Sequence, residues 1–137
     1  MAAHSKKHRT ILLFGTDHEV LRSRSKCLTQ IGFHVLNSSN GFEAIQMSSL
    51  AVVDAVVLDQ DRNTAEVELV AREIKRLRPR MPTILLAEAC EPAVRTRELA
   101  DAMVLREEKV SSLVTALEEI LAARSSENQA ALKNQLL

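Results

Sequence analysis

The sequence predicts a doubly wound α/β fold, in which a five-stranded parallel sheet of order 2-1-3-4-5 carries five helices on its two faces. Short apolar runs of strand length alternate along the chain with longer segments in which apolar residues recur every three or four positions. Several of the short runs are apolar throughout, as parallel strands are when helices cover both faces of their sheet. A chain of 137 residues favours this order over the larger six-stranded sheet.

Five segments have the length and composition of strands. The runs TILLF, AVVL and TILL are almost entirely apolar, which predicts central strands. The segment FHVL contains His34 and is expected at an edge of the sheet or half-exposed. In chain order the expected strands are residues 10–14, 33–36, 55–58, 83–86 and 102–105.

The segments between these strands have the periodicity of amphipathic helices. Thr16 and Glu19 have capping-box spacing, which predicts that Thr16 caps the first helix, and Gly32 is a stop signal at its other end. Asn40 and Glu43 repeat the same spacing before the second helix. In chain order the expected helices are residues 16–31, 40–50, 67–77, 92–99 and 110–121.

Composition and charge limit the possible functions and partners. Lys+Arg equals Asp+Glu at 18 each, which argues against direct binding of nucleic acid or of an acidic membrane. No apolar run approaches the roughly 20 residues of a membrane span, so cytoplasmic residence is expected. We expect a basic segment at 1–8, one domain at 9–124, and a polar tail at 125–137 that either extends the last helix or frays.

Several side chains of the first helix are interpreted as ordinary structural features. Cys27 lies on the apolar stripe of the first helix, which predicts a buried, inert thiol. Arg22, Arg24 and Lys26 on the same helix are expected to form a solvated charged face. His18 is expected to face solvent.

Candidate functional residues follow the strands at one edge of the predicted sheet. In an open parallel sheet, ligands bind beyond the carboxyl ends of the strands, where the strand order reverses. Asp59 ends the third strand, and we expect it to form an ion pair with Arg106, which follows the fifth. Other residues expected on this rim are Gly15, Thr16, Asp17, Ala87 and Glu88.

Three stretches of the sequence, VVLDQDR (56–62), ADAMVLR (100–106) and LVTALEEIL (113–121), resemble the third strand, the fifth strand and the last helix of bacterial response regulator receiver domains. The resemblance covers residues 9–124 and implies the flavodoxin-like, receiver-type fold. It further implies a stand-alone receiver protein in phosphorelay (two-component) signal transduction, which has no enzyme activity of its own. Asp59 would accept the phosphoryl group, and the partner would be a histidine kinase or another signalling protein.

The metal site of the family is incomplete in this sequence. Receiver domains usually place two acidic residues directly after the first strand to hold Mg²⁺, and those positions are Gly15 and Thr16 here. Asp17 and Asp59 remain as metal candidates, so the resemblance implies a Mg²⁺ site that is weak or absent. Asp17 is otherwise expected to be a carboxylate that stabilises the helix start.

The phosphate site departs from the family pattern as well. The hydroxyl residue after the fourth strand is Ala87, and the lysine after the fifth strand is Arg106. Together with Thr16 and Asp17, these residues are the expected neighbours of a phosphoryl group. The departures leave open a second function, in which a degenerate pseudo-receiver serves as a phosphorylation-independent interaction module. The expected output face of either contains Arg95, Arg97, Met103 and Glu118.

Overall fold

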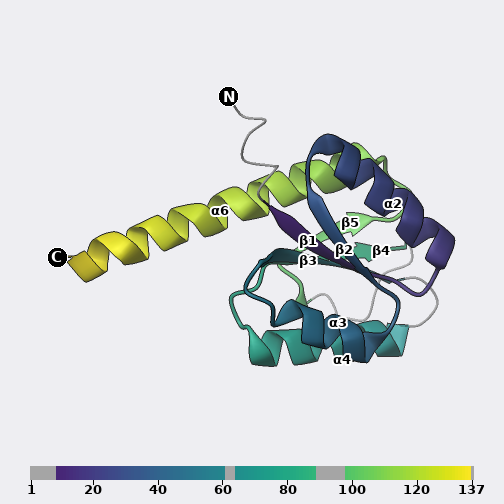
Figure 1. Ribbon diagram of the computed structural model, residues 1–137, viewed down its shortest axis with the longest axis horizontal. Coiled ribbons are helices and arrows are strands. Elements are labelled where there is room, and N and C mark those ends of the chain that lie inside the picture. The colour runs from purple at the N-terminus through teal and green to yellow at the C-terminus, as the bar shows by residue number, and fades with distance from the viewer. Residues whose placement is uncertain (1–8, 61–63, 89–97, 137) are drawn as a thin grey trace.

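The computed structural model describes residues 9–60, 64–88 and 98–136. Its strands pair in parallel in the order β2-β1-β3-β4-β5 (Figure 1), which confirms the predicted sheet. The strands are β1 (Thr10–Phe14), β2 (His34–Ser38), β3 (Val53–Asp59), β4 (Thr83–Ala87) and β5 (Ala102–Leu105).

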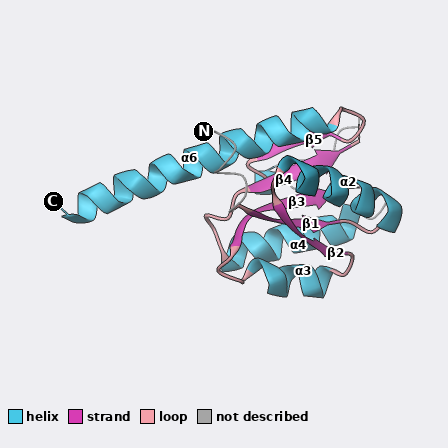
Figure 2. Ribbon diagram, turned by 45° about the horizontal axis from the view of Figure 1, so that its top comes forward, coloured by secondary structure: helices cyan, strands magenta, loops and turns pink. Residues whose placement is uncertain are grey.

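Helices cover both faces of this sheet, as Figure 2 shows. The described helices are α2 (His18–Ile31), α3 (Gly41–Ser48), α4 (Thr64–Leu77) and α6 (Val110–Leu136). Helices α2 and α6 lie on one face, and α3 and α4 lie on the other. Most of the helix expected at 92–99 lies outside the described residues, and only Glu98 and Leu99 are seen to be helical.

Two apolar cores result, one on each face of the sheet. Successive side chains of a strand point to opposite faces, so Ile11 and Leu13 join the core under α2 and α6, while Leu12 and Phe14 join the core over α3 and α4. All four of these side chains are fully buried. Burial on both faces is the physical reason that β1 is apolar throughout.

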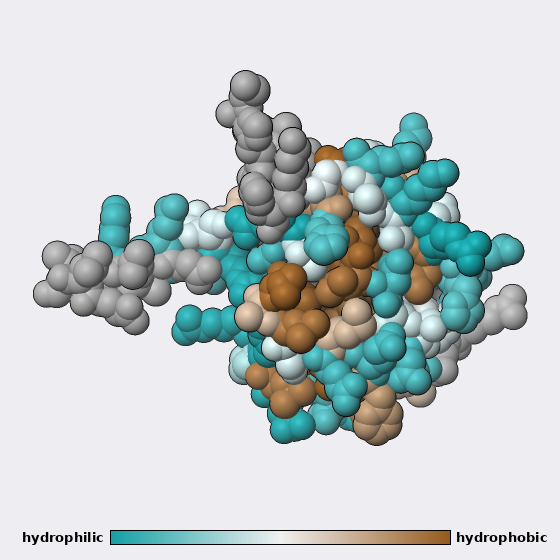
Figure 3. Space-filling view, in the orientation of Figure 1, coloured by the Kyte–Doolittle hydropathy of each residue, from teal (hydrophilic) through white to brown (hydrophobic). Residues whose placement is uncertain are grey.

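Strand β2 forms one edge of the sheet, as its mixed composition predicted. It pairs with β1 alone among the described strands, and its burial rises from an exposed His34 to a buried Ser38. The strand begins one residue later than expected because the Phe33 amide donates to the Leu28 carbonyl at 3.1 Å, at the end of α2, while its side chain packs into the core below that helix. Hydrophobic surface gathers on this side of the molecule, in the middle of the face shown in Figure 3.

The polar tail continues the last helix, so the first of the two alternatives for it is correct. Helix α6 runs without interruption to Leu136, and its final turns extend beyond the body of the domain (Figure 1). Arg124 Nη1 donates to the Asp54 carbonyl at 2.7 Å, and Arg9 Nη2 donates to Ser125 Oγ at 2.8 Å. Across the described ranges, no helix has both the length and the apolar composition needed to span a bilayer.

Candidate functional site

The site is centred on Asp59, the last residue of β3. Only 1% of this residue is exposed, because the strand is central in the sheet and pairs with β1 and β4 on either side. The loop after β1 passes directly against it. A Cβ atom at Gly15 would come within 3.2 Å of the Asp59 Cβ, so a larger residue at position 15 needs a shift of this loop.

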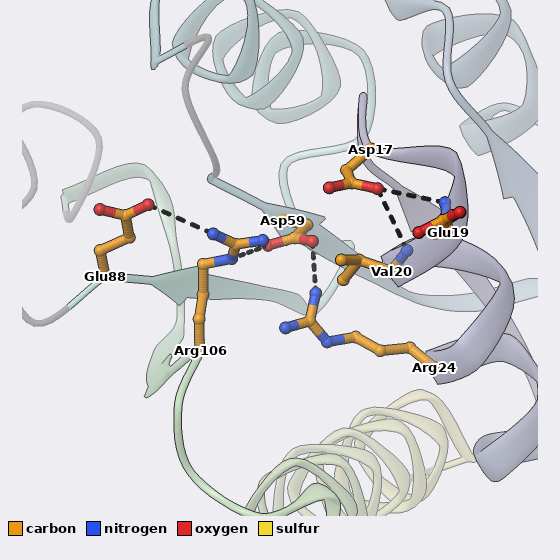
Figure 4. A network of polar contacts seen from close by, with 7 residues as sticks. All are labelled: Asp17, Glu19, Val20, Arg24, Asp59, Glu88 and Arg106. Carbon is orange, nitrogen blue, oxygen red and sulfur yellow. Dashed lines mark hydrogen bonds and ion pairs between the residues drawn. The ribbon is translucent and has the colours of Figure 1, made fainter.

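Two guanidinium groups enclose the Asp59 carboxylate, one from each side (Figure 4). Arg106 Nε donates a hydrogen bond to Oδ1 at 2.7 Å, and Arg24 Nη1 donates to Oδ2. Arg106 also donates from Nη1 to the exposed carboxylate of Glu88, at 3.3 Å. The ion pair expected between Asp59 and Arg106 is therefore present, and a second cation accompanies it.

Sequence reasoning missed the second cation. Arg24 does not belong to a solvated face of α2, because its side chain is only 17% exposed and reaches the end of β3. Its position contained a signal for this. Arg24 lies three residues after Leu21 and four before Leu28, which are the buried residues of α2, so it falls on the buried stripe of the helix. A charged residue on such a stripe usually has a partner of opposite charge.

Burial raises the pKa of the Asp59 carboxyl above its ordinary value, and the charges of Arg24 and Arg106 oppose that rise. The direction follows from the low exposure of the carboxylate, since removal of a charge from water disfavours the ionised form. The two arginines are therefore the groups that permit a charged aspartate at this position. Loss of either one would move the pKa of Asp59 further upward.

Comparison with known protein structures identifies the fold of this chain. No protein-family model and no curated protein matches the chain. A response regulator receiver protein from Sinorhizobium medicae is 28% identical, with 86% of this chain and 98% of that one covered at a TM-score of 0.69. A CheY-like receiver domain protein from Methanospirillum hungatei is 20% identical, with coverage of 87% and 98% and a TM-score of 0.77.

A response regulator protein from Thermotoga maritima in complex with Mg²⁺–BeF is 22% identical, with coverage of 82% and 98% and a TM-score of 0.72. These structures share the five-stranded order found here over most of the chain. This chain has the receiver-domain fold. The fold predicted from the sequence is thereby confirmed.

In this receiver fold, Asp17 caps the N-terminus of α2. Its Oδ1 accepts from the backbone amides of Glu19 and Val20, at 3.1 and 3.3 Å, and Asp17 is thus the N-cap of α2. The prediction that Thr16 is the cap was wrong by one residue, because Asp17 lies directly before the first helical residue, where a side-chain oxygen reaches two unpaired amides. The predictions that Asp17 stabilises the helix start and that His18 faces solvent are confirmed.

The residues present do not fit the Mg²⁺ ion that this fold often holds. Both oxygens of Asp59 accept from guanidinium groups, and the carboxylate of Asp17 is engaged in capping. Within the part of the chain that the structure describes, no three acidic, histidine or cysteine residues cluster closely enough to hold a metal. Mg²⁺ requires oxygen ligands, whereas two cationic side chains surround the carboxylate here.

The remaining predicted residues divide into two groups. Ala87 ends β4 fully buried, and its carbonyl accepts from the Arg106 amide at 2.7 Å, so position 87 offers a methyl group and no hydroxyl. Met103 on β5 is 45% exposed, and Glu118 is exposed on α6, so both side chains are accessible from solvent. Arg95 and Arg97 lie outside the described residues.

Proposed function

We propose that this chain is a signalling module of the receiver fold that binds partner proteins without being phosphorylated. The enclosure of Asp59 carries the proposal. The carboxylate is 1% exposed, and each of its oxygens accepts a hydrogen bond from a different arginine. Arg24 and Arg106 offset part of the cost of burying its charge, and they occupy both carboxylate oxygens.

Phosphoryl transfer to Asp59 meets two obstacles in this geometry. A phosphodonor has to approach a carboxylate oxygen in line, and catalysis of this reaction depends on cations that offset the charge of the phosphoryl group. Arg24 covers one oxygen and Arg106 the other. The acidic pair that would hold a metal is replaced by Gly15 and Thr16, and Ala87 lacks a hydroxyl.

One observation favours the second candidate, a phosphorelay receiver that uses Asp59 as its phosphoacceptor. Asp59 ends the central strand β3 of a fold shared with receiver domains, and Arg106 beside it carries the charge of the family's lysine. In that case a histidine kinase is the natural partner. Arg24 would have to leave Asp59 before the transfer.

For either function we propose that partners bind at β5, the edge strand of the sheet. Met103 supports this choice, because a methionine that is 45% exposed adapts to varied apolar partners. Its neighbours Ala102 and Val104 pack toward α6, so Met103 points to the opposite face of the sheet from the exposed Glu118 of α6. The partner class is a histidine kinase or another signalling protein, with no direct role for nucleic acid or membrane.

The test is intact mass after incubation with acetyl phosphate and Mg²⁺, for the wild type, Asp59→Asn and Arg24→Gln. The proposal expects no phosphoryl group on the wild type. A phosphoryl group on Arg24→Gln that disappears in the double variant with Asp59→Asn would show that Arg24 is the obstacle. A phosphoryl group on the wild type that Asp59→Asn removes would overturn the proposal in favour of the second candidate.

Partner binding is tested with a photo-crosslinking residue in place of Met103, and with the same residue at Leu69 as a control. Leu69 is equally exposed, at 47%, and lies on a different element, α4. The proposal expects position 103 to capture the same protein with and without the phosphodonor, and position 69 to capture none. Capture that appears only after addition of the phosphodonor would contradict it.

A further inference from the structure

A cavity of about 180 Å³ lies beside the Asp59 ion pairs, between α2, the end of β5 and the start of α6. Buried apolar side chains form part of its lining, namely Leu86, Val104 and Leu113. Arg24 and Arg106 line it as well, so the two guanidinium groups that hold Asp59 also face this space. The cavity therefore combines an apolar wall with two partly buried cations.

The two arginines are the groups of this cavity that would receive an anion. Lys109 and Glu108 also line the cavity, and because both are exposed and opposite in charge, they largely offset each other. Within the described residues, Arg24 donates to Asp59 from Nη1, and Figure 4 shows its other terminal nitrogen directed into the space between Arg24 and Arg106. A guanidinium presents five N–H donors in a planar fork that suits carboxylate oxygens, so donor capacity remains for a ligand.

We propose that this cavity binds a small organic anion, with its carboxylate at Arg24 and Arg106 and its apolar part against Leu86, Val104 and Leu113. The volume limits the ligand to a single ring or a short chain, because an apolar cavity of roughly 150 Å³ accepts benzene. A neutral molecule of the same shape lacks the charge attraction to the arginines, and a cationic one is repelled by them. The site extends beyond the proposed interaction function and does not depend on it.

Cys27 provides a direct reporter for this site. The thiol was predicted to be buried and inert, but it is only half-buried, because its position on α2 faces the cavity. A ligand in the cavity should therefore shield it. With Cys90 replaced by serine, Cys27 is the one remaining thiol of the chain, and its rate of modification by neutral iodoacetamide can be followed by intact mass.

The experiment compares benzoate, benzyl alcohol and benzylamine at constant ionic strength. We expect benzoate to slow modification about tenfold when nine-tenths of the site is occupied, as mass action requires, with no effect from the alcohol or the amine. Arg24→Gln should abolish the protection. Arg76→Gln should retain it, because Arg76 is an exposed arginine of α4 on the other face of the sheet.

Two outcomes would overturn the assignment. One is the absence of protection by benzoate up to about 10 mM, ten times a Kd of roughly 1 mM. The other is equal protection by benzyl alcohol, which would show that the arginines take no part. If Cys27 reacts too slowly to follow, the Nε–H resonances of Arg24 and Arg106 give the readout in the wild type. They should shift with benzoate alone, and unchanged resonances would refute the site.

Discussion

Strand β3 has one aspartate next to its first residue and another as its last residue, both near arginines, and the two ends differ in what holds the carboxylate. Near the start, Asp54 accepts from the Thr10 backbone amide at 2.7 Å, with Arg9 Nη1 at 4.0 Å from its other oxygen. At the end, Asp59 has no backbone donor among its described contacts and accepts from two guanidinium groups. The side chain of Asp54 is 25% exposed, against 1% for Asp59.

The carboxylate of Asp54 is structural, whereas the charge of Asp59 is costly because it is buried. Asp54 shares its charge with water and joins two adjacent strands through a main-chain hydrogen bond, so few changes elsewhere alter its state. Asp59 has lost its water and depends wholly on side chains from α2 and from the end of β5. Movement of either arginine changes the pKa of Asp59, so the charge at this end of the strand depends on how α2 and the end of β5 are placed.

The largest expected effect is loss of both cations at the buried end. In Arg24→Leu with Arg106→Leu, the Asp59 carboxylate is left buried and unpaired, and we expect a loss of about 3–5 kcal/mol in the free energy of unfolding at neutral pH. Urea unfolding monitored by circular dichroism gives the value. Addition of Asp59→Asn to this double variant should restore most of the loss, and a triple variant that is no more stable would contradict the account.

Asp54→Ala should have a smaller effect at the other end of the strand. It removes the acceptor for the Thr10 amide, which solvent can partly replace, so we expect a loss of about 1.5 kcal/mol in the free energy of unfolding. The matched variant Asp54→Asn retains an oxygen acceptor and should lose less. Equal losses for the two variants would assign the stabilisation to the distant Arg9 charge instead of the hydrogen bond.

The third carboxylate of the region, Asp17, tests whether proximity to the rim makes a residue part of the site. Asp17→Ala should lower the free energy of unfolding by about 1 kcal/mol through loss of the α2 cap, and Asp17→Ser should restore most of it. Thermal unfolding in the presence and absence of Mg²⁺ provides the measurement. A Mg²⁺-dependent stabilisation that disappears in Asp17→Ala would make Asp17 a metal ligand.

The last expected effect is a change of stability with pH that belongs to Asp59 alone. Burial raises its pKa in the folded state, so its contribution to stability is fully present below the unfolded value of about 3.9 and is lost as the pH rises through the folded pKa. The slope cannot exceed about 1.4 kcal/mol per pH unit for one proton. Urea midpoints between pH 4 and pH 7 should therefore fall less for Asp59→Asn than for the wild type, and identical profiles would contradict the prediction.

Local patterns were sufficient to predict most of the fold. The runs that became β1, β3 and β4 are apolar on both faces because two helical layers bury them, and that burial leaves a direct trace in composition. The mixed segment around His34 became the edge strand for the same reason. Element ends were predicted less well: α4 begins three residues and β3 two residues earlier than expected. The single-residue shifts at Thr16 and Phe33 were decided by hydrogen bonds at the two ends of α2.

The candidate site was only partly predictable. Strand-end logic brought Asp59 and Arg106 together, because both follow strands whose carboxyl ends share one rim. Arg24 lies 35 positions from Asp59 in the sequence, and no local pattern pairs them. Its place on the buried stripe of α2 indicated a partner but could not identify it.

The sequence by itself determined the sheet, its strand order and the position of Asp59. Periodicity is a local property that marks each strand and helix, chain length limits their number, and parallel β-α units leave few topologies. Only the tertiary structure decided that Asp59 is enclosed by two arginines and that a cavity adjoins them. These features depend on how α2 and α6 are rotated against the sheet and on how far long side chains reach. The distances between these side chains are fixed only after both helices have packed against the sheet.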